Sequence, residues 1–465
     1  MTHTQATPAP RRRVSSGAPR ALERPTGRML APSTRRAPTG DVESPPIGPQ
    51  IIRHEWVHRG STDVVLLLVV GALVLIGLLA VYSGSALNSF FASASQNDLT
   101  YVTRQASGVV AGLLLMIFTS RFDYGHYRTR FIYVLLAAAY VLLAMTWIPA
   151  LSTEVNGARR WISLFGFRFQ PAEYAKIVTV MYLAYSISKK GETMTRFLDS
   201  FAFHGLVFGL MVLFLMRQPD LGSSVVICTM VAIMLFVGGA RASFLMGFVG
   251  LGIVSVYAAI QSASYRMDRV TAWIDPWADP AESGYQLVNS YVALANGGLT
   301  GTGFGQGRGR LGYVPELYND FVGALIGEEF GLVGIAFVAF LFVLFFWRGV
   351  LIAYRARDRF GFLLALGITT LITLQAVINL GVVTGMLPTK GLTLPFVSYG
   401  RSSLVLLLGA VGILLNIGQR NPDLRTERKQ AKEESERELT ARMKRHRVME
   451  RRRTRALKRV GHTDV

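Results

Sequence analysis

Ten long apolar segments, separated by polar connections, dominate the middle of the chain. About 20 apolar residues are needed to cross a hydrocarbon core of roughly 30 Å. Lipid offers no partner for unpaired backbone groups, so each spanning segment has to be a helix. The pattern therefore predicts an all-α polytopic membrane protein with about ten transmembrane helices. The expected spans are approximately residues 64–83, 101–120, 131–148, 171–188, 202–217, 223–240, 243–262, 321–347, 361–384 and 402–418.

Basic residues in the connections predict the orientation of these spans. Arg and Lys gather in every second connection, and such connections remain in the cytoplasm. An even number of spans then places both termini in the cytoplasm as well. The remaining segments are expected outside, and the largest is the loop between helices 7 and 8. These outer segments are residues 84–100, 149–170, 218–222, 263–320 and 385–401.

The two ends of the chain differ in composition from the membrane domain, residues 62–418. Residues 1–61 are rich in Arg, Pro, Ser and Thr without periodicity, which predicts a disordered basic cytoplasmic tail. Residues 419–465 mix Arg, Lys and Glu and predict a charged cytoplasmic tail. The net charge of +20 lies mainly in these tails and in the connections, so it indicates topology rather than nucleic-acid binding. The single cysteine, Cys228, excludes an internal disulfide framework.

Cations cluster in the predicted outer segments beyond what simple connections need. Arg159 and Arg160 stand beside Trp161, where the ring suits an interfacial anchor and the guanidinium groups suit anion capture. Arg217 ends the fifth span. Lys390 is the cation of a Gly- and Pro-rich segment that is expected to fold sharply. These positions predict a phosphate-binding site on the outer side.

Acidic residues occur at membrane depth, where an ionisable group is expensive. Glu173 and Lys176 lie three residues apart at the start of the fourth span and can pair with each other or with a ligand. Asp220 precedes the sixth span, either as a helix N-cap or as a metal ligand.

Asp320 stands where the long outer loop meets the bilayer, near Glu316, Glu328 and Glu329 in sequence. Crowded, partly desolvated carboxylates suit a general base, although an Asp at a helix start can also be only a cap. The Gly-rich run 301–309 predicts a flexible or tightly turning lid, because no Lys-Ser or Lys-Thr pair follows it.

Five motifs, in order, resemble the shape, elongation, division and sporulation (SEDS) family of polytopic glycosyltransferases across nearly the whole membrane domain. They are NGARRWI at 156–162, QPAEYAK at 170–176, RQPDLG at 217–222, YVPELYNDFVGALIGEE at 313–329 and LPTKGLTLPFVSYG at 387–400. The division-type member is the nearest in pattern, and the elongation-type member is second. The chain departs from the family at Arg401, where a second Gly is usual, and at Leu317, Tyr318 and Asn319.

The resemblance implies a peptidoglycan glycosyltransferase that polymerises lipid II during septal wall synthesis, with Asp320 as the catalytic residue. As a general base, Asp320 would take the proton of the acceptor 4-hydroxyl, and the reaction would invert the anomeric centre. A divalent cation, Mg²⁺ or Mn²⁺, could bridge the pyrophosphate to Asp220 or Asp320. The residues expected to bind the substrate or its pyrophosphate are Arg160, Lys176, Arg217, Lys390, Glu173, Gln286, Glu316 and Ser398.

The family also implies a class B penicillin-binding transpeptidase as partner, together with other division proteins, in the bacterial inner membrane. Two other function classes remain open from the residues alone. A lipid II flippase would also place charged groups inside a helical bundle, and a scaffold would only recruit division proteins. Asp320 discriminates among them, because only the polymerase requires a base at that position.

Overall fold

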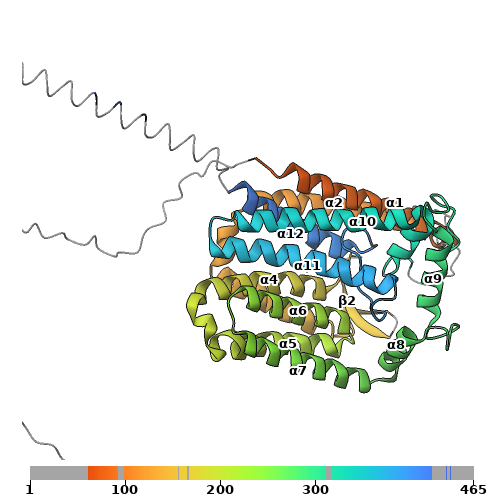
Figure 1. Cartoon of the computed structure of the whole chain (residues 1–465), viewed down its shortest axis with the longest axis horizontal. Coiled ribbons are helices and arrows are strands. Elements are labelled where there is room, and N and C mark those ends of the chain that lie inside the picture. The colour runs from red at the N-terminus through yellow and green to blue at the C-terminus, as the bar shows by residue number, and fades with distance from the viewer. Residues whose placement is uncertain are drawn as a thin grey trace, which may run out of the picture. The chain divides into compact units, whose positions relative to one another are not determined.

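A computed structural model describes residues 61–92, 99–155, 157–164, 167–309 and 317–420, with Glu436, Thr440 and Met443. The two predicted tails, 1–61 and 419–465, lie almost entirely outside the described residues, and so does Glu316. The described part of the membrane domain is a bundle of helices (Figure 1).

Helices occupy all ten of the predicted positions. They are α1 (Val64–Ala92), α2 (Thr100–Arg121), α3 (Phe131–Met145), α4 (Pro171–Lys190), α5 (Phe203–Arg217), α6 (Leu221–Val237), α7 (Ala242–Gln261), α10 (Val322–Tyr354), α11 (Arg359–Val383) and α12 (Arg401–Gln419). Among the described residues, seven helical segments are long and apolar enough to cross a membrane. The chain is therefore a multi-pass membrane protein. The helices α3 and α6 are shorter and α4 is not among the seven, so the count of ten stays a prediction.

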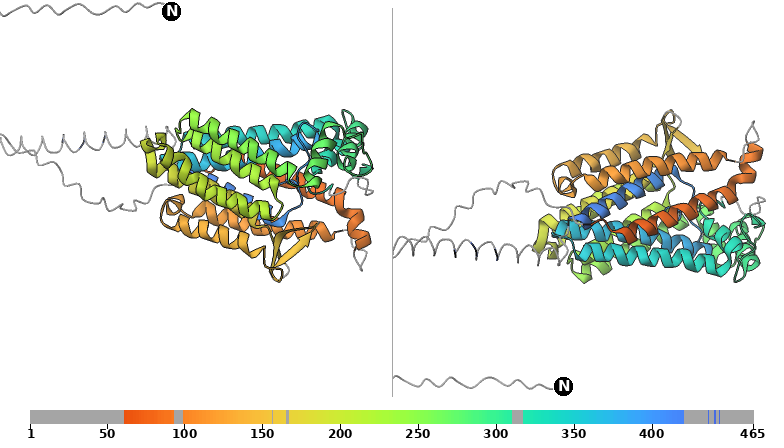
Figure 2. Two further views of the ribbon diagram at one scale, coloured as in Figure 1. Left: turned by 90° about the horizontal axis from the view of Figure 1, so that it is seen from below. Right: turned by 90° about the horizontal axis from the view of Figure 1, so that it is seen from above.

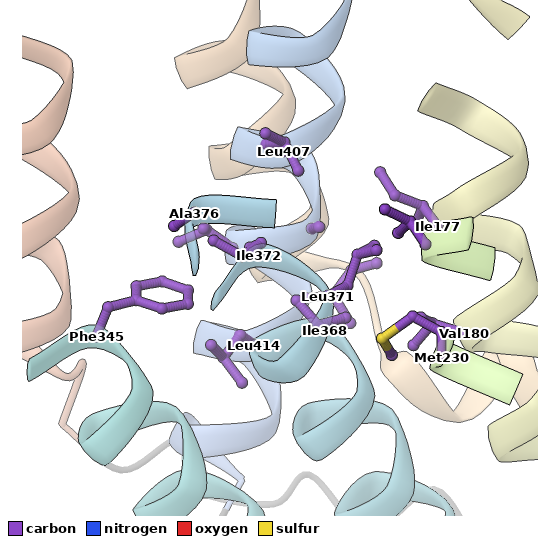
Figure 3. Packing of buried hydrophobic residues seen from close by; sticks show 14 of the residues in the cluster. Ile177, Val180, Met230, Phe345, Ile368, Leu371, Ile372, Ala376, Leu407 and Leu414 are labelled. Atoms are coloured by element: carbon purple, nitrogen blue, oxygen red, sulfur yellow. The ribbon is translucent and has the colours of Figure 1, made fainter. Parts of the chain in front are cut away.

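The apolar core lies where α4, α6, α10, α11 and α12 meet. Figure 3 shows Ile177 of α4, Met230 of α6, Phe345 of α10, Leu371 of α11 and Leu414 of α12 within this cluster. In an 18-residue stretch of α12, 78% of the residues are buried, and in a stretch of the same length in α11 the share is 67%. Helix α7, which the structure describes in full, has no buried residue. The bundle is therefore built around α11 and α12, with α7 at its edge.

Small residues bring α12 against α2. A Cβ at Gly412 would collide with the backbone of Met116 and the hydroxyl of Thr119. That hydroxyl donates a hydrogen bond of 2.8 Å to the carbonyl of Gly409. Close backbone approach at small residues is a common way to hold helices together in lipid, where the hydrophobic effect does not draw them together.

The outer segments contain structure that the hydropathy pattern did not predict. One is an antiparallel sheet of β1 (Ser152–Val155), β2 (Ala158–Leu164) and β3 (Phe167–Phe169) in that order. The long outer loop carries α8 (Ser264–Ile274) and α9 (Tyr285–Gly297). Both views of Figure 2 place this green to teal loop towards the same end of the bundle as the sheet. Short helical turns complete the connections: η1 (Tyr124–Arg128), η2 (Gly191–Thr195) and η3 (Leu198–Ala202).

The Gly-rich run 301–309 turns tightly, with positive φ at Gly301, Gly303 and Gly305, and its role as a lid stays a prediction. It is anchored to α10, which has a non-helical residue at Gly331. The backbone N–H of Thr302 donates to the carbonyl of Glu328 at 2.9 Å. The Glu328 carboxylate accepts hydrogen bonds from the backbone amides of residues 308 and 309, at 2.9 and 3.0 Å. Glu328 therefore stabilises this loop rather than standing as a bare carboxylate beside Asp320.

Candidate functional site

A cavity of about 120 Å³ lies among the outer segments, where β2, the turn before α6, α7, α8 and the loop after α11 meet. Its charged lining comes from segments far apart in sequence. These residues are Arg160, Asp220, Arg266, Arg269 and Lys390. Four cations around one small space suit a ligand that carries several negative charges.

Asp320 lies beside this cavity. A Cβ built on Gly391, which lines the cavity, would be 3.2 Å from Oδ2 of Asp320 and 4.0 Å from a terminal guanidinium nitrogen of Arg160. The N-cap position of α10 belongs to Phe321, so Asp320 is not the cap of that helix. The structure thus brings together Asp320, Arg160 and Lys390, three of the residues that the sequence predicted.

Helix α11 and the loop after it fix the backbone around Asp320. The buried side chain of Asn379 donates hydrogen bonds from Nδ2 to the carbonyls of Asp320, at 2.8 Å, and Leu392, at 2.6 Å. Ser398 donates from its hydroxyl to the carbonyl of Asn319 at 2.6 Å. Ser398, predicted as a substrate ligand, is itself buried and engaged with the backbone. Its observed contact holds the backbone next to Asp320.

Helix α2 supports the same loop from the other side. Gln105, which is buried, donates from Nε2 to the carbonyl of Ser398 at 3.2 Å and accepts from the backbone N–H of Gly400 at 3.2 Å. The backbone N–H of Tyr399 donates to the carbonyl of Tyr318 at 2.8 Å. The rings of Tyr318 and Tyr399 pack against each other and against Tyr101 of α2. These contacts leave little freedom in the segment that carries Asp320.

Two of the cations in the outer segments are destabilised in their charged form. Burial lowers the pKa of Lys390 below its ordinary value. Arg269 keeps an exposed side chain because it borders the cavity, yet the protein packed around it lowers the pKa of its guanidinium. Neighbouring Arg160 lowers the pKa of Arg269 further, and Asp320 raises it. A bound anion would favour the charged form of both groups.

Arg160 and Asp220 also have structural contacts. The guanidinium of Arg160 donates from Nε to the carbonyl of Gln218 at 3.1 Å and from Nη2 to the carbonyl of Pro219 at 2.6 Å. A guanidinium has five N–H donors, so these two bonds orient the group without exhausting it. Asp220 caps α6, because its Oδ1 accepts the backbone N–H of Ser223 at 2.9 Å.

The described residues do not form a complete metal site from protein ligands. No group of three His, Cys, Asp or Glu side chains that could hold a metal ion occurs within them. Asp220 already accepts a hydrogen bond at the start of α6. A Mg²⁺ ion bound here would have to take most of its ligands from water and from phosphate oxygens, as this ion often does. The divalent cation therefore stays a prediction.

Other predicted ligands lie away from this cavity. Lys176 is buried and donates from Nζ to Oε1 of Glu173 at 2.7 Å and to Oε1 of Gln375 at 2.6 Å. Ser403 of α12 donates to the second oxygen of Glu173 at 3.2 Å. This ion pair joins three helices inside the bundle, and neither member lines the cavity.

Two further predicted ligands are placed elsewhere in the outer region. Gln286 lies on α9 and is half-buried, and it does not line the cavity. Arg217 lines a different, larger space of about 430 Å³, together with Arg159. Their roles as pyrophosphate ligands remain predictions.

The sequence reasoning missed Arg266, Arg269 and Asn379. Arg266 and Arg269 lie three residues apart on α8, a helix in a loop that carries no hydropathy signal of its own. Their i, i+3 spacing on an amphipathic segment was the available clue. Asn379 is a polar residue inside an apolar span, which marks a functional position in a membrane protein.

Comparison with known proteins agrees with this architecture. The family model described as a cell cycle protein, and named for FtsW, RodA and SpoVE, matches residues 63–422. The probable peptidoglycan glycosyltransferase FtsW of Geobacter metallireducens is 41% identical over 359 residues, which cover 77% of this chain and 95% of that protein. Stage V sporulation protein E of Bacillus subtilis is 38% identical over 363 residues, covering 78% of this chain and 98% of that protein.

Two solved structures share the fold. A chain from a study of how a peptidoglycan synthase complex coordinates polymerization and crosslinking superimposes with a TM-score of 0.65 and 29% identity, covering 78% of this chain and 99% of that chain. The rod shape determining protein RodA of Thermus thermophilus superimposes with a TM-score of 0.58 and 26% identity, covering 78% of this chain and 98% of that chain.

Proposed function

This chain belongs to the family of FtsW, RodA and SpoVE cell cycle proteins, and we infer that it is a peptidoglycan glycosyltransferase that polymerises lipid II into glycan strands. The observation that carries this inference beyond the family is the position of Asp320. Its carboxylate lies beside a cavity lined by Arg160, Arg269 and Lys390. A base next to an anion-binding cavity is the arrangement that sugar transfer from a pyrophosphate donor needs.

The proposed reaction is a single displacement. Asp320 accepts the proton of the acceptor 4-hydroxyl while that oxygen bonds to the anomeric carbon of the donor sugar. The bond from this carbon to the pyrophosphate oxygen breaks on the opposite face, so the configuration inverts. Because no covalent sugar-enzyme intermediate forms, one carboxylate and a stabilised leaving group are sufficient.

The cations beside Asp320 are proposed to stabilise the departing pyrophosphate. Arg160 is held in place by two backbone carbonyls, so it requires no reorganisation when charge develops. Lys390 is partly buried, where attraction to an anion is stronger than in water, and Arg269 borders the same cavity. If Mg²⁺ or Mn²⁺ is bound, its contribution would be to neutralise the same oxygens.

The direct test compares wild-type protein with Asp320→Asn in polymerisation of purified lipid II, in detergent and with the cognate transpeptidase. Asn keeps the shape of the side chain and removes the base, so we expect turnover to fall by roughly 10²- to 10⁴-fold. Asp268→Asn, an exposed carboxylate on α8, is the matched control and should retain wild-type turnover. Wild-type protein that forms no glycan even with the partner, but moves lipid II across vesicles, would establish the flippase instead.

We further propose that the protein acts in septal wall synthesis in the bacterial inner membrane, with a class B penicillin-binding transpeptidase and other division proteins. Similarity to proteins named FtsW and to a chain from a synthase complex supports this role. Similarity to RodA makes elongation the alternative. Depletion in the source bacterium discriminates between the two, because loss of septal synthesis gives filaments and loss of elongation gives rounded cells.

A further inference from the structure

Two walls of the cavity beside Asp320 come from distant parts of the sequence. One wall is α8, whose residues Tyr265, Arg266, Arg269 and Val270 line the cavity. The other is the loop after α11, which lines it with residues 388–391. Because the two segments are far apart in sequence, only contacts between them in the folded protein can fix the distance across the cavity.

Trp273 makes such a contact. Its indole N–H donates a hydrogen bond of 2.8 Å to the backbone carbonyl of Gly385. Trp273 follows Arg266 and Arg269 at helical spacing, so the three residues share one face of α8. Gly385 comes shortly before Pro388, the first residue of the loop after α11 that lines the cavity. The hydrogen bond therefore joins the two walls just beyond the cavity itself.

The carbonyl that accepts this hydrogen bond is held by the end of α11. Gly385 has a φ of +71°, a left-handed conformation that favours glycine, and its N–H donates to the carbonyl of Val382 at 3.0 Å. A Cβ at this position would collide with the hydroxyl of Tyr291 on α9. The buried Ser290, also on α9, donates to the carbonyl of Val383 at 2.9 Å. The turn is thus a fixed point to which α8 is attached.

The other end of α8 is attached to a less firmly packed part of the bundle. Arg266 donates from Nη1 to the carbonyl of Ala259 on α7 at 2.7 Å, and from Nε to the hydroxyl of Tyr265 at 2.9 Å. No residue of α7 is buried, whereas most of α11 is. Arg269 lies between the two attachments and borders the cavity. Its position relative to the bundle core therefore depends mainly on the attachment made by Trp273.

We propose that Trp273 is a positioning residue, whose hydrogen bond to Gly385 holds Arg269 at the distance from Lys390 that lets both cations contact one pyrophosphate. The proposal rests on the proposed polymerase function and adds a residue that acts through Arg269. Cations that are already in place need no reorganisation when charge develops on the leaving group. Without the indole N–H, α8 loses its hydrogen bond to the end of α11, and Arg269 is held less firmly opposite Lys390.

The binding test uses the full-length protein in detergent, with geranylgeranyl pyrophosphate as a probe that carries the anion without a sugar. Trp273→Phe keeps an aromatic ring and removes the N–H donor. It should weaken binding at least fivefold in protein that has Arg269, and less than twofold in protein with Arg269→Ala. In protein with Arg160→Ala it should still weaken binding at least fivefold, because Arg160 belongs to β2 and not to α8.

Equal weakening by Trp273→Phe with and without Arg269 would overturn the proposal, since the indole would then support the fold in general. Binding that Trp273→Phe leaves unchanged would overturn it too. Trp277→Phe is the matched control, because Trp277 lies in the same outer loop, exposes 60% of its surface and lines neither of the two cavities. This control should bind the probe as wild type does, and an equal loss in it would contradict the assignment to Trp273. The Tm of each variant in the same detergent establishes that it is folded.

Polymerisation of lipid II tests the consequence for the reaction. Trp273→Phe should lower kcat/KM at least fivefold when Arg269 is present and less than twofold in Arg269→Ala, while Trp277→Phe should keep the wild-type value. Additive losses in the double variant would refute the action through Arg269. If wild-type protein makes no glycan at all, the polymerase function fails, and the binding test still decides whether Trp273 positions Arg269.

Discussion

Asn379 should be required to position Asp320, and Asn379→Ala removes that support without touching the carboxylate. The side chain is 1% exposed and donates to two carbonyls, those of Asp320 at 2.8 Å and Leu392 at 2.6 Å. Its removal leaves both carbonyls buried without this donor, at about 1–3 kcal/mol each. We therefore expect the free energy of unfolding to fall by roughly 2–6 kcal/mol.

The loss of activity should exceed what the loss of folded protein explains. A displacement of about 1 Å in a catalytic group can cost on the order of 10²-fold in rate. Asn379→Ala should therefore lower kcat by about 10²-fold per folded molecule while changing KM for lipid II much less, because the cations of the cavity remain. Asn379→Asp keeps the shape but replaces the donor with an acceptor, so it should be no better.

Asn416→Ala is the matched control. Asn416 is also 1% exposed and also bonds two backbone groups, donating to the carbonyl of Ser120 at 2.7 Å and accepting from the N–H of Tyr124 at 3.1 Å. It lies on α12, in contacts that do not involve residues 318–320. The assay measures turnover of lipid II normalised to folded protein, alongside Tm in the same detergent. If both variants lose the same turnover per folded molecule, the positioning argument for Asn379 is wrong.

Three further predictions concern the cations and the close packing of the site. Burial lowers the pKa of Lys390, so its positive charge is lost at a lower pH than the charge of free lysine. If this charge attracts pyrophosphate, kcat/KM should fall on the alkaline side of its pH profile. In Lys390→Arg this fall should move to higher pH, because arginine keeps its charge. Gly391→Ala places a Cβ 3.2 Å from Oδ2 of Asp320, the proposed base. We expect kcat to fall about tenfold with little change in Tm, and full turnover would contradict this close packing. Lys176→Met leaves the buried Glu173 carboxylate without its ion-pair partner, so the free energy of unfolding should fall by about 3–5 kcal/mol. Adding Glu173→Gln should restore part of the lost stability in a denaturant titration. No restoration would refute the importance of the pair.

The sequence identified the helices well because the signal is local. A span must be apolar along its own length whatever its neighbours are, and all ten predicted positions are helical in the structure. The outer segments were predicted poorly for the opposite reason. Helices α8 and α9 and the sheet β1–β3 are short, and the protein around them rather than lipid decides whether they form.

Hydropathy and motif order were sufficient to predict the membrane fold, the family and the single carboxylate on which the proposed chemistry depends. Composition and motif order are properties of the chain itself, so they can be read without knowing the fold. Which charges share a cavity became known only from the folded structure. It placed Arg160, Arg269 and Lys390 beside Asp320, and it placed Lys176 inside the bundle, paired with a neighbour on its own helix. Side chains from loops far apart in sequence converge only when the backbone paths are known, and no local pattern encodes those paths.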